Sequence, residues 1–166
     1  TLTLAHLFVE AIGVDPDPGM LAEAQRRAEI GGVSNVRWVQ ARAEELPLDL
    51  GNFTMACFAQ SFHWMDRPRV AAIMYDMLEP DGLFVHLSDR KTPRHDPGNL
   101  PYPMPPYDVI SELVQRYLGP VRRAGKGVLH HGTPGDEAAI LRNADFLGPE
   151  RIIFPATEPH LRSIDD

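Results

Sequence analysis

The chain has 166 residues, with 43% hydrophobic and 23% charged, which is ordinary for one globular domain with a sizeable core. A net charge of −7 argues against a general nucleic-acid binder, which would present a basic face. The single cysteine excludes an internal disulfide and suits a reducing cytosol, and no apolar run is long enough to span a membrane. We therefore expect a cytoplasmic protein without a membrane span.

The first predicted elements are a buried strand over residues 8–14 and a helix that begins at Pro18. Asp17 has the side chain of a helix N-cap, and proline suits the first helical position. Gly31 and Gly32 end the helix. Apolar residues at helical spacing predict a stripe that faces the core: Met20, Leu21, Ala24 and Ala28.

Two further strands are predicted over residues 36–39 and 53–59, with a loop at 41–47 between them. The run at 53–59 is mostly apolar, which is typical of a central strand in a parallel sheet. Its Cys57 is expected to be an inert core residue. A loop at 60–66 follows this strand.

A helix that opens at Pro68, a turn at 79–82 and a strand at 83–87 complete the alternation of strands and helices. Such alternation predicts a parallel sheet with right-handed crossovers. The fold class is therefore α/β, with a Rossmann-like, doubly wound and mostly parallel sheet. Residues 1–89 would form this nucleotide-binding core.

The character of the chain changes after residue 89. Six prolines between Pro93 and Pro106 exclude a helix or central strand there. Helices are predicted at 107–118 and 136–144, with a basic stretch between them that contains Arg122, Arg123 and Lys126. Residues 90–149 would form a Pro-rich segment and a helical cap. Residues 150–166 would hold a return strand at 151–154 and the start of an unfinished helix at 163–166.

Ligands of open parallel sheets bind beyond the carboxyl ends of the strands. Three predicted strands end there in segments that would together line one pocket: Asp15–Pro18, Ala41–Glu44 and Gln60–Trp64. Asp15 would accept hydrogen bonds from the two hydroxyls of a ribose. The alternative is that Asp15 only caps the turn before the helix, although Asp17 already supplies a cap.

These segments resemble class I S-adenosylmethionine-dependent methyltransferases of the type 11 branch. The matching segments are residues 13–20, 41–47, 59–66 and 78–82, in order and at the ends of successive elements. The resemblance covers about half of the chain. It implies S-adenosyl-L-methionine as cofactor, with Asp15 on its ribose, Pro16 and Met20 along its adenine, and Ala43 and Glu44 on the other side of the base. Glu44 would otherwise be a solvated loop acid.

Two positions depart from the family pattern. The glycine-rich turn and the strand before it, which hold the methionine part of the cofactor, are absent, so the chain resembles a fragment cut at its N-terminus and also at its C-terminus. Arg42 stands where the family commonly has an acid that contacts the adenine amino group. We expect the fragment to be inactive on its own and to self-associate through exposed sheet edges.

The segment that contains Gln60, Ser61, His63 and Trp64 lies at the predicted pocket mouth. Trp64 would pack on cofactor or substrate, and His63 would orient substrate or act as a base. The alternative is that both side chains only fill the space between sheet and helix. Methyl transfer depends largely on alignment, so no base is required. The cap residues Tyr102, Tyr107, Arg122 and Arg123 are candidates for choosing the acceptor.

The predicted function is methyl transfer to a small-molecule or lipid-like acceptor. Two alternatives stay open: a nicotinamide-dependent oxidoreductase, which also places an acid after its second strand, and a catalytically dead interaction module on the same fold. No metal site is expected, because the adjacent His130 and His131 have no further ligand at suitable spacing.

Overall fold

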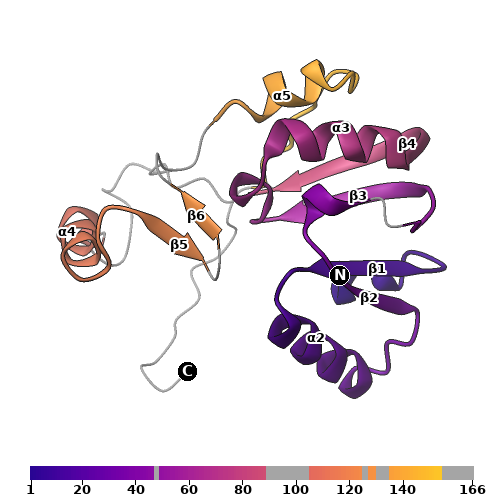
Figure 1. Ribbon diagram of the computed structural model, residues 1–166, viewed down its shortest axis with the longest axis horizontal. Coiled ribbons are helices and arrows are strands. Elements are labelled where there is room, and N and C mark those ends of the chain that lie inside the picture. The colour runs from indigo at the N-terminus through magenta and orange to yellow at the C-terminus, as the bar shows by residue number, and fades with distance from the viewer. Residues whose placement is uncertain (47–48, 89–104, 125–126, 130–134, 155–166) are drawn as a thin grey trace.

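The computed structural model describes residues 1–46, 49–88, 105–124, 127–129 and 135–154. Within them, strands and helices alternate as predicted (Figure 1). The alternating elements are β1 (Ala11–Asp15), α2 (Pro18–Ile30), β2 (Val36–Gln40), β3 (Phe53–Ala59), α3 (Arg67–Met77) and β4 (Leu78–Leu87). The strands pair in parallel, β1 with β2 and β3 with β4. The α/β, Rossmann-like class is confirmed by these two βαβ units.

The parallel strands form two separate pairs rather than one continuous sheet. Among the described residues, β1 is hydrogen-bonded only to β2 and β3 only to β4. The first pair packs against α2 and the second against α3. Among these described residues, β1 and β3 each keep one edge without a strand partner.

The first strand begins later than predicted. Residues 8–10 are not part of β1, and Val9 is 98% exposed. A short helix, α1 (Leu2–Ala5), precedes them and was not predicted. Asn35 ties this segment to the start of β2, because its side-chain amide donates to the carbonyl oxygens of Ala5 (2.8 Å) and Phe8 (2.9 Å). The prediction of a strand from residue 8 was wrong because apolar character alone does not create a strand partner.

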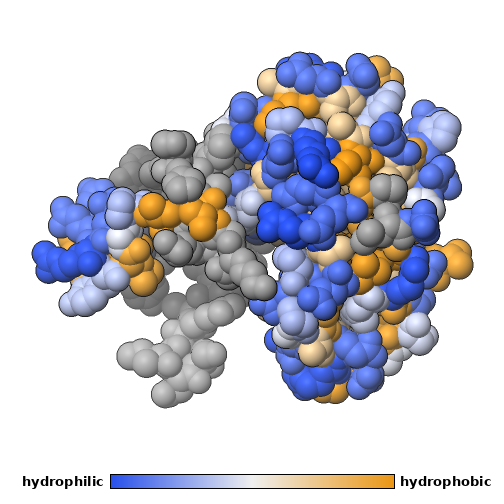
Figure 2. All heavy atoms as spheres, in the orientation of Figure 1, coloured by the Kyte–Doolittle hydropathy of each residue, from blue (hydrophilic) through white to orange (hydrophobic). Residues whose placement is uncertain are grey.

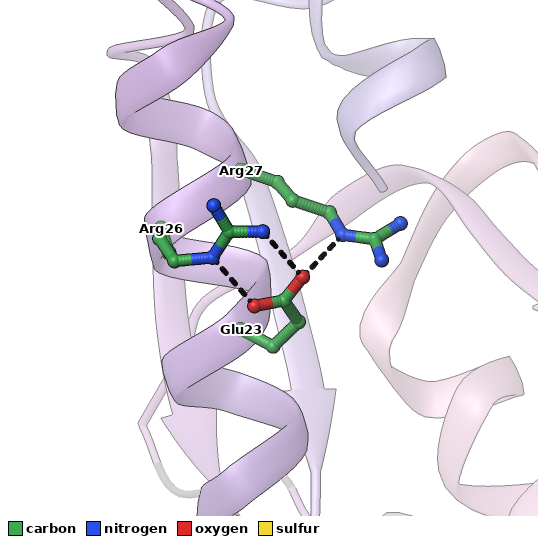
Figure 3. A network of polar contacts seen from close by, with 3 residues as sticks. All are labelled: Glu23, Arg26 and Arg27. Atoms are coloured by element: carbon green, nitrogen blue, oxygen red, sulfur yellow. Dashed lines mark hydrogen bonds and ion pairs between the residues drawn. The ribbon is translucent and has the colours of Figure 1, made fainter.

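The bounds of α2 follow the predicted signals. The Asp17 carboxylate accepts from the backbone N–H groups of Gly19 (2.7 Å) and Met20 (3.3 Å), and the helix ends at Gly31. The core-facing stripe is narrower than predicted, since Ala28 is buried but Met20 is 60% exposed. On the outer face, Glu23 accepts hydrogen bonds from Arg26 and Arg27 (Figure 3).

The hydrophobic core lies almost entirely in the second half of the α/β unit. Phe62, in the short 3-10 helix η2 (Phe62–Trp64), and Val70 of α3 are fully buried. The helix α5 (Glu137–Asn143) completes this core by packing Ile140 and Leu141 against α3. Residues of the 90–149 segment therefore contribute to the core, not only to a cap. Cys57 on β3 is exposed, which corrects the prediction that it is a core residue.

The predicted turn at 79–82 lies inside β4 as an irregularity in its pairing. Phe53 pairs with Leu78, whereas Met55, two residues on, pairs with Leu83. Asp81 has a φ of 64°, and a Cβ on Gly82 would lie 2.8 Å from the carbonyl oxygen of Glu79. The tight turn therefore requires glycine at position 82.

The helix α4 (Tyr107–Leu118) has the predicted bounds, but its apolar side is exposed. An antiparallel hairpin follows, formed by β5 (Arg122–Ala124) and β6 (Gly127–Leu129), where the sequence had indicated only a basic stretch. The helix α4 lies apart from the α/β unit, whereas β6 of the hairpin contacts η2 (Phe62–Trp64) of that unit (Figure 1). Apolar side chains reach the surface around α4 (Figure 2). The exposed apolar residues of α4 are Tyr107, Val109, Ile110, Leu113, Val114, Tyr117 and Leu118.

Two predictions concern the end of the chain. Residues 151–154 are exposed and form no strand, so the predicted return strand was wrong. The predicted unfinished helix at 163–166 and the prolines at 93–103 lie outside the described residues. No helix in the described part of the chain is long and apolar enough to cross a membrane.

Candidate active site

Asp15 is the last residue of β1, where it pairs in register with Gln40 of β2. Its Oδ1 accepts a hydrogen bond from the backbone N–H of Asp17 at 2.8 Å. Asp15 thus supports the turn, while Asp17 caps the helix. Among the described residues, Oδ2 of Asp15 has no hydrogen-bond donor. The partly buried carboxylate therefore retains a free acceptor at the carboxyl edge of the strand.

A hollow of about 150 Å³ lies beside Asp15, between α2 and the β1–β2 pair. Trp38 of β2 lies against Gly13, and a Cβ at position 13 would overlap its indole ring. The Nε1 of Trp38 is buried and has no hydrogen-bond partner among the described residues. The hollow is lined by Thr1, Gly13, Val14, Asp15, Met20, Leu21, Ala24 and Trp38.

The second predicted segment forms the 3-10 helix η1 (Ala43–Glu45) directly after β2. Ala43 packs against the core, whereas Arg42 is exposed. The backbone N–H of Arg42 donates to the Glu45 carboxylate at 3.1 Å, which closes the turn. The Arg42 guanidinium lies 3.5 Å from Oε2 of Glu44 and so is directed to a neighbour in its own loop.

Glu44 joins the second segment to the third. Its Oε1 accepts from the backbone N–H of Asp66 at 3.0 Å, and its side chain is only 14% exposed. Burial acts to raise the pKa of Glu44, but the Asp66 N–H, a second backbone N–H and the nearby Arg42 outweigh it and lower that pKa overall. Glu44 is thus a charged, partly buried acceptor rather than a solvated loop acid.

The third segment crosses the end of β3. Gln60 has a φ of 53°, and its backbone N–H donates to the carbonyl of Leu87 at 2.9 Å. Ser61 and Trp64 are half-buried. His63 is buried, with its ring centroid 5.1 Å from that of Trp64. This burial favours the packing interpretation of His63 over the catalytic one. The hairpin strand β6 contacts η2, so part of the predicted cap lies beside this segment.

The structure brings the predicted site residues together in two groups. Asp15 and Met20 share the hollow beside β1, and Pro16, which is exposed, adjoins them in the chain. Glu44 and the 60–66 segment form the second group through the Asp66 hydrogen bond. Glu44 and Trp64 do not line the hollow that contains Asp15. Roles in cofactor binding stay predictions for all of these residues.

Sequence reasoning missed Trp38 as a neighbour of the candidate site. Its position depends on the register that places it opposite Gly13, and a single sequence does not state register. Of the acceptor candidates, Tyr107 is exposed on α4, Arg122 and Arg123 lie on β5, and Tyr102 is outside the described residues. Within the described residues, no group of three His, Cys, Asp or Glu side chains is placed to hold a metal ion.

Residues 1–82 match the methyltransferase domain family. This match, the two βαβ units and the acid at the end of β1 all agree with the resemblance to class I S-adenosylmethionine-dependent methyltransferases. The match ends near the turn within β4, so α4, the hairpin and α5 lie outside it.

Two curated relatives are methyltransferases. The chain is 33% identical over 86 residues to the ubiquinone/menaquinone biosynthesis C-methyltransferase UbiE of Psychromonas ingrahamii, covering 51% of this chain and 34% of that protein. It is 32% identical over 111 residues to the demethylmenaquinone methyltransferase of Thermus thermophilus, covering 66% of this chain and 47% of that protein. The chain therefore spans between a third and a half of the length of these relatives.

Two solved structures are similar over about half of the chain. The YcgJ protein of Bacillus subtilis has 30% identity and a TM-score of 0.48 over 51% of this chain and 37% of its own. An S-adenosylmethionine-dependent methyltransferase of Clostridium acetobutylicum has 20% identity and a TM-score of 0.45 over 50% of this chain and 35% of its own.

Proposed function

We propose that the protein transfers a methyl group from S-adenosyl-L-methionine to a small-molecule or lipid-like acceptor. The observation that carries the proposal is the carboxylate of Asp15. One of its oxygens is fixed by the Asp17 N–H at 2.8 Å, and the other has no donor among the described residues. A carboxylate held in this way at the carboxyl edge of a parallel strand is suited to a ribose hydroxyl.

The residues around Asp15 fit a nucleoside. The hollow beside it has an apolar lining from Met20 and Leu21, and Trp38 contributes a buried donor without a partner among the described residues. In the proposal, Asp15 holds the ribose, while Pro16 and Met20 line one side of the adenine and Ala43 the other. The bound cofactor supplies an electrophilic methyl group. The protein then has to align the acceptor and exclude water, and His63 need not act as a base.

The acceptor is proposed to approach over the 60–66 segment. Trp64 is half-buried there, and the β5–β6 hairpin lies beside it through β6. One curated relative is named for ubiquinone/menaquinone biosynthesis and the other as a demethylmenaquinone methyltransferase, which favours an acceptor with a lipid-like part. A single cysteine is in keeping with a reducing compartment, so we place this activity in the cytoplasm.

Binding experiments on the protein expressed from its complete reading frame test this proposal. S-adenosylhomocysteine and NAD are titrated in parallel by calorimetry. Binding of S-adenosylhomocysteine alone is the expected result. Binding of NAD alone would favour a nicotinamide-dependent oxidoreductase, since Asp15 suits either ribose. Binding of neither nucleotide would favour an interaction module without catalytic activity.

Asp15→Ala is expected to weaken S-adenosylhomocysteine binding by about 2–4 kcal/mol, or roughly 30- to 1000-fold, because charge-assisted hydrogen bonds to the ribose are lost. Asp15→Asn keeps an acceptor for the Asp17 N–H and so separates ribose binding from support of the turn. Asp17→Ala is the matched control. It should cost about 1 kcal/mol of stability through the lost helix cap, with little effect on affinity. If only Asp17→Ala abolished binding, the ribose would be assigned to the wrong carboxylate.

We also propose that the chain self-associates when it is expressed alone. The edges of β1 and β3 that lack a described strand partner, and the exposed apolar residues Leu83 and Leu87 on β4, support this proposal. Light scattering across micromolar concentrations is expected to give a mass above 18.5 kDa. A monodisperse monomer with a cooperative melt would contradict it.

A further inference from the structure

The side chain of Glu44 joins two segments of the candidate site, one that follows β2 and one between β3 and α3. We define the cofactor-side loop as residues 41–45, after β2, and the acceptor-side loop as residues 60–66, between β3 and α3. Glu44 Oε1 accepts from the Asp66 N–H at 3.0 Å across 22 residues of sequence.

The Glu44 side chain is more shielded from solvent than the Arg42 side chain in the same loop. The side chain is 14% exposed, while the Arg42 side chain that flanks it at 3.5 Å is 57% exposed. Ala43 and Leu46 on one side, and Met65 on the other, pack against the hydrophobic core. The acceptor end of the bond is therefore shielded, whereas Asp66 at the donor end is exposed, so solvent reaches one side of the bond.

The other end of the bond lies where α3 begins. Asp66 is the N-cap of α3, and its own carboxylate accepts from the Arg69 N–H at 3.3 Å. The Asp66 N–H therefore remains available for an acceptor outside the helix, and Glu44 provides it. A negative charge at this end also interacts favourably with the helix dipole of α3. Fixing Asp66 fixes the two residues before it in the chain, Trp64 and Met65.

We infer that Glu44 is a positioning residue that couples the cofactor-side loop to the acceptor-side loop, rather than a direct contact of the adenine. The inference rests on the proposed function only for the names of the two loops. The hydrogen-bonded connection between the loops does not depend on that function. A nucleotide that orders residues 41–45 would also order the segment that carries His63 and Trp64. Cofactor binding would then prepare the surface on which the acceptor lies.

Hydrogen exchange measured by mass spectrometry tests the link without any ligand. Glu44→Ala should lower the protection of residues 60–66 by about tenfold, the equivalent of one hydrogen bond to a charged acceptor. Glu44→Gln keeps a side-chain carbonyl that can accept from Asp66, so it should retain most of the protection. Glu45→Ala is the matched control, since Glu45 is exposed and accepts only within its own turn. A thermal melt of each variant distinguishes local release from global unfolding.

The same variants are then titrated with S-adenosylhomocysteine. The parent and Glu44→Gln should show added protection at both loops, and Glu44→Ala only at residues 41–45. Unchanged protection of residues 60–66 in ligand-free Glu44→Ala would overturn the inference, whatever the nucleotide does. Loss of that protection in a protein that binds no S-adenosylhomocysteine would support the link and contradict the proposed function. An equal loss of protection in Glu44→Gln and Glu44→Ala would also overturn the inference, because Glu44→Gln keeps an acceptor for the Asp66 N–H.

Discussion

The two halves of the α/β unit are built alike and packed differently. In the half formed by β1, β2 and α2, the buried apolar side chains of the described residues are alanines: Ala28 of α2 is 3% exposed and Ala41 is 5% exposed. In the half formed by β3, β4 and α3, Phe62 and Val70 are fully buried, and α5 adds Ile140 and Leu141. Apolar burial, and hence most of the stability, is therefore concentrated in the second half.

The candidate site residues lie in both halves. Asp15 and Met20 belong to the lightly packed half, and the 60–66 segment belongs to the densely packed one. Local stability follows packing, so the cofactor side is expected to open more easily than the acceptor side. The loop that carries Glu44 follows β2 of the first half, while Ala43 and Leu46 beside it pack against the core of the second half, where Glu44 also bonds to the Asp66 N–H.

The largest expected effect is on the free energy of unfolding and comes from the half formed by β3, β4 and α3. Phe62→Ala should lower the free energy of unfolding by about 3–5 kcal/mol, because it removes a fully buried ring and leaves a cavity. Urea denaturation followed by circular dichroism measures this loss. Leu147→Ala serves as control, since Leu147 is 97% exposed and should change stability by less than about 0.5 kcal/mol. A Phe62→Ala loss below about 1 kcal/mol would contradict the assignment of stability to this half.

The next effect tests the close contact beneath Asp15. Gly13→Ala places a methyl group where the Trp38 ring lies, so we expect a loss of about 1–3 kcal/mol from overpacking. Adding Trp38→Leu should recover part of that loss, which a double-mutant cycle in denaturant would reveal as coupling between the two positions. Gly135→Ala is the matched control, because a Cβ there meets nothing within 4 Å. Additive effects of Gly13→Ala and Trp38→Leu would contradict the contact.

Sequence signals predicted best where the physics is local. The N-cap Asp17, the proline after it and the glycine pair after Ile30 fixed α2, and α4 and β3 have the predicted bounds. Each of these signals acts within one turn or one strand of its own element. The position of Asp15 at the end of a strand followed from the same local pattern.

The features that sequence reasoning missed depend on contacts between distant residues. Residues 8–10 and 151–154 are apolar enough for strands but have no strand partner in the described part of the chain, and Cys57 lies on a face of β3 that is exposed. The register of Gly13 with Trp38 and the bond from Glu44 to Asp66 join residues far apart in sequence. A hydrophobic pattern predicts that a residue prefers burial, but not whether another element arrives to bury it.

A smaller loss of stability is expected in the first half, where side-chain hydrogen bonds connect residues 1–10 to the start of β2. Asn35→Ala should cost about 1–2 kcal/mol, because two side-chain hydrogen bonds to the carbonyls of Ala5 and Phe8 are lost. Hydrogen exchange should rise in residues 1–10 and stay unchanged in α3, while Ser34→Ala, at an exposed neighbouring position, should affect neither. An equal rise in α3 would show that the two halves unfold together rather than separately.

The smallest effect on stability concerns the outer face of α2, whose charged side chains are exposed to solvent. Hydrogen bonds from Arg26, then from Arg27, lower the pKa of Glu23 to about 2 (Figure 3). Because the pKa of the folded state is depressed, the stabilisation is fully present above the ordinary pKa of glutamate and is lost as the pH falls toward 2. The three side chains are 40–68% exposed, so salt screens the network and its contribution to stability is small. Carboxyl NMR of Glu23 should give a midpoint well below the ordinary pKa of glutamate. The stability difference between the parent and Glu23→Gln should shrink both on acidification and in high salt, and a difference that survives both would require a source other than these ion pairs.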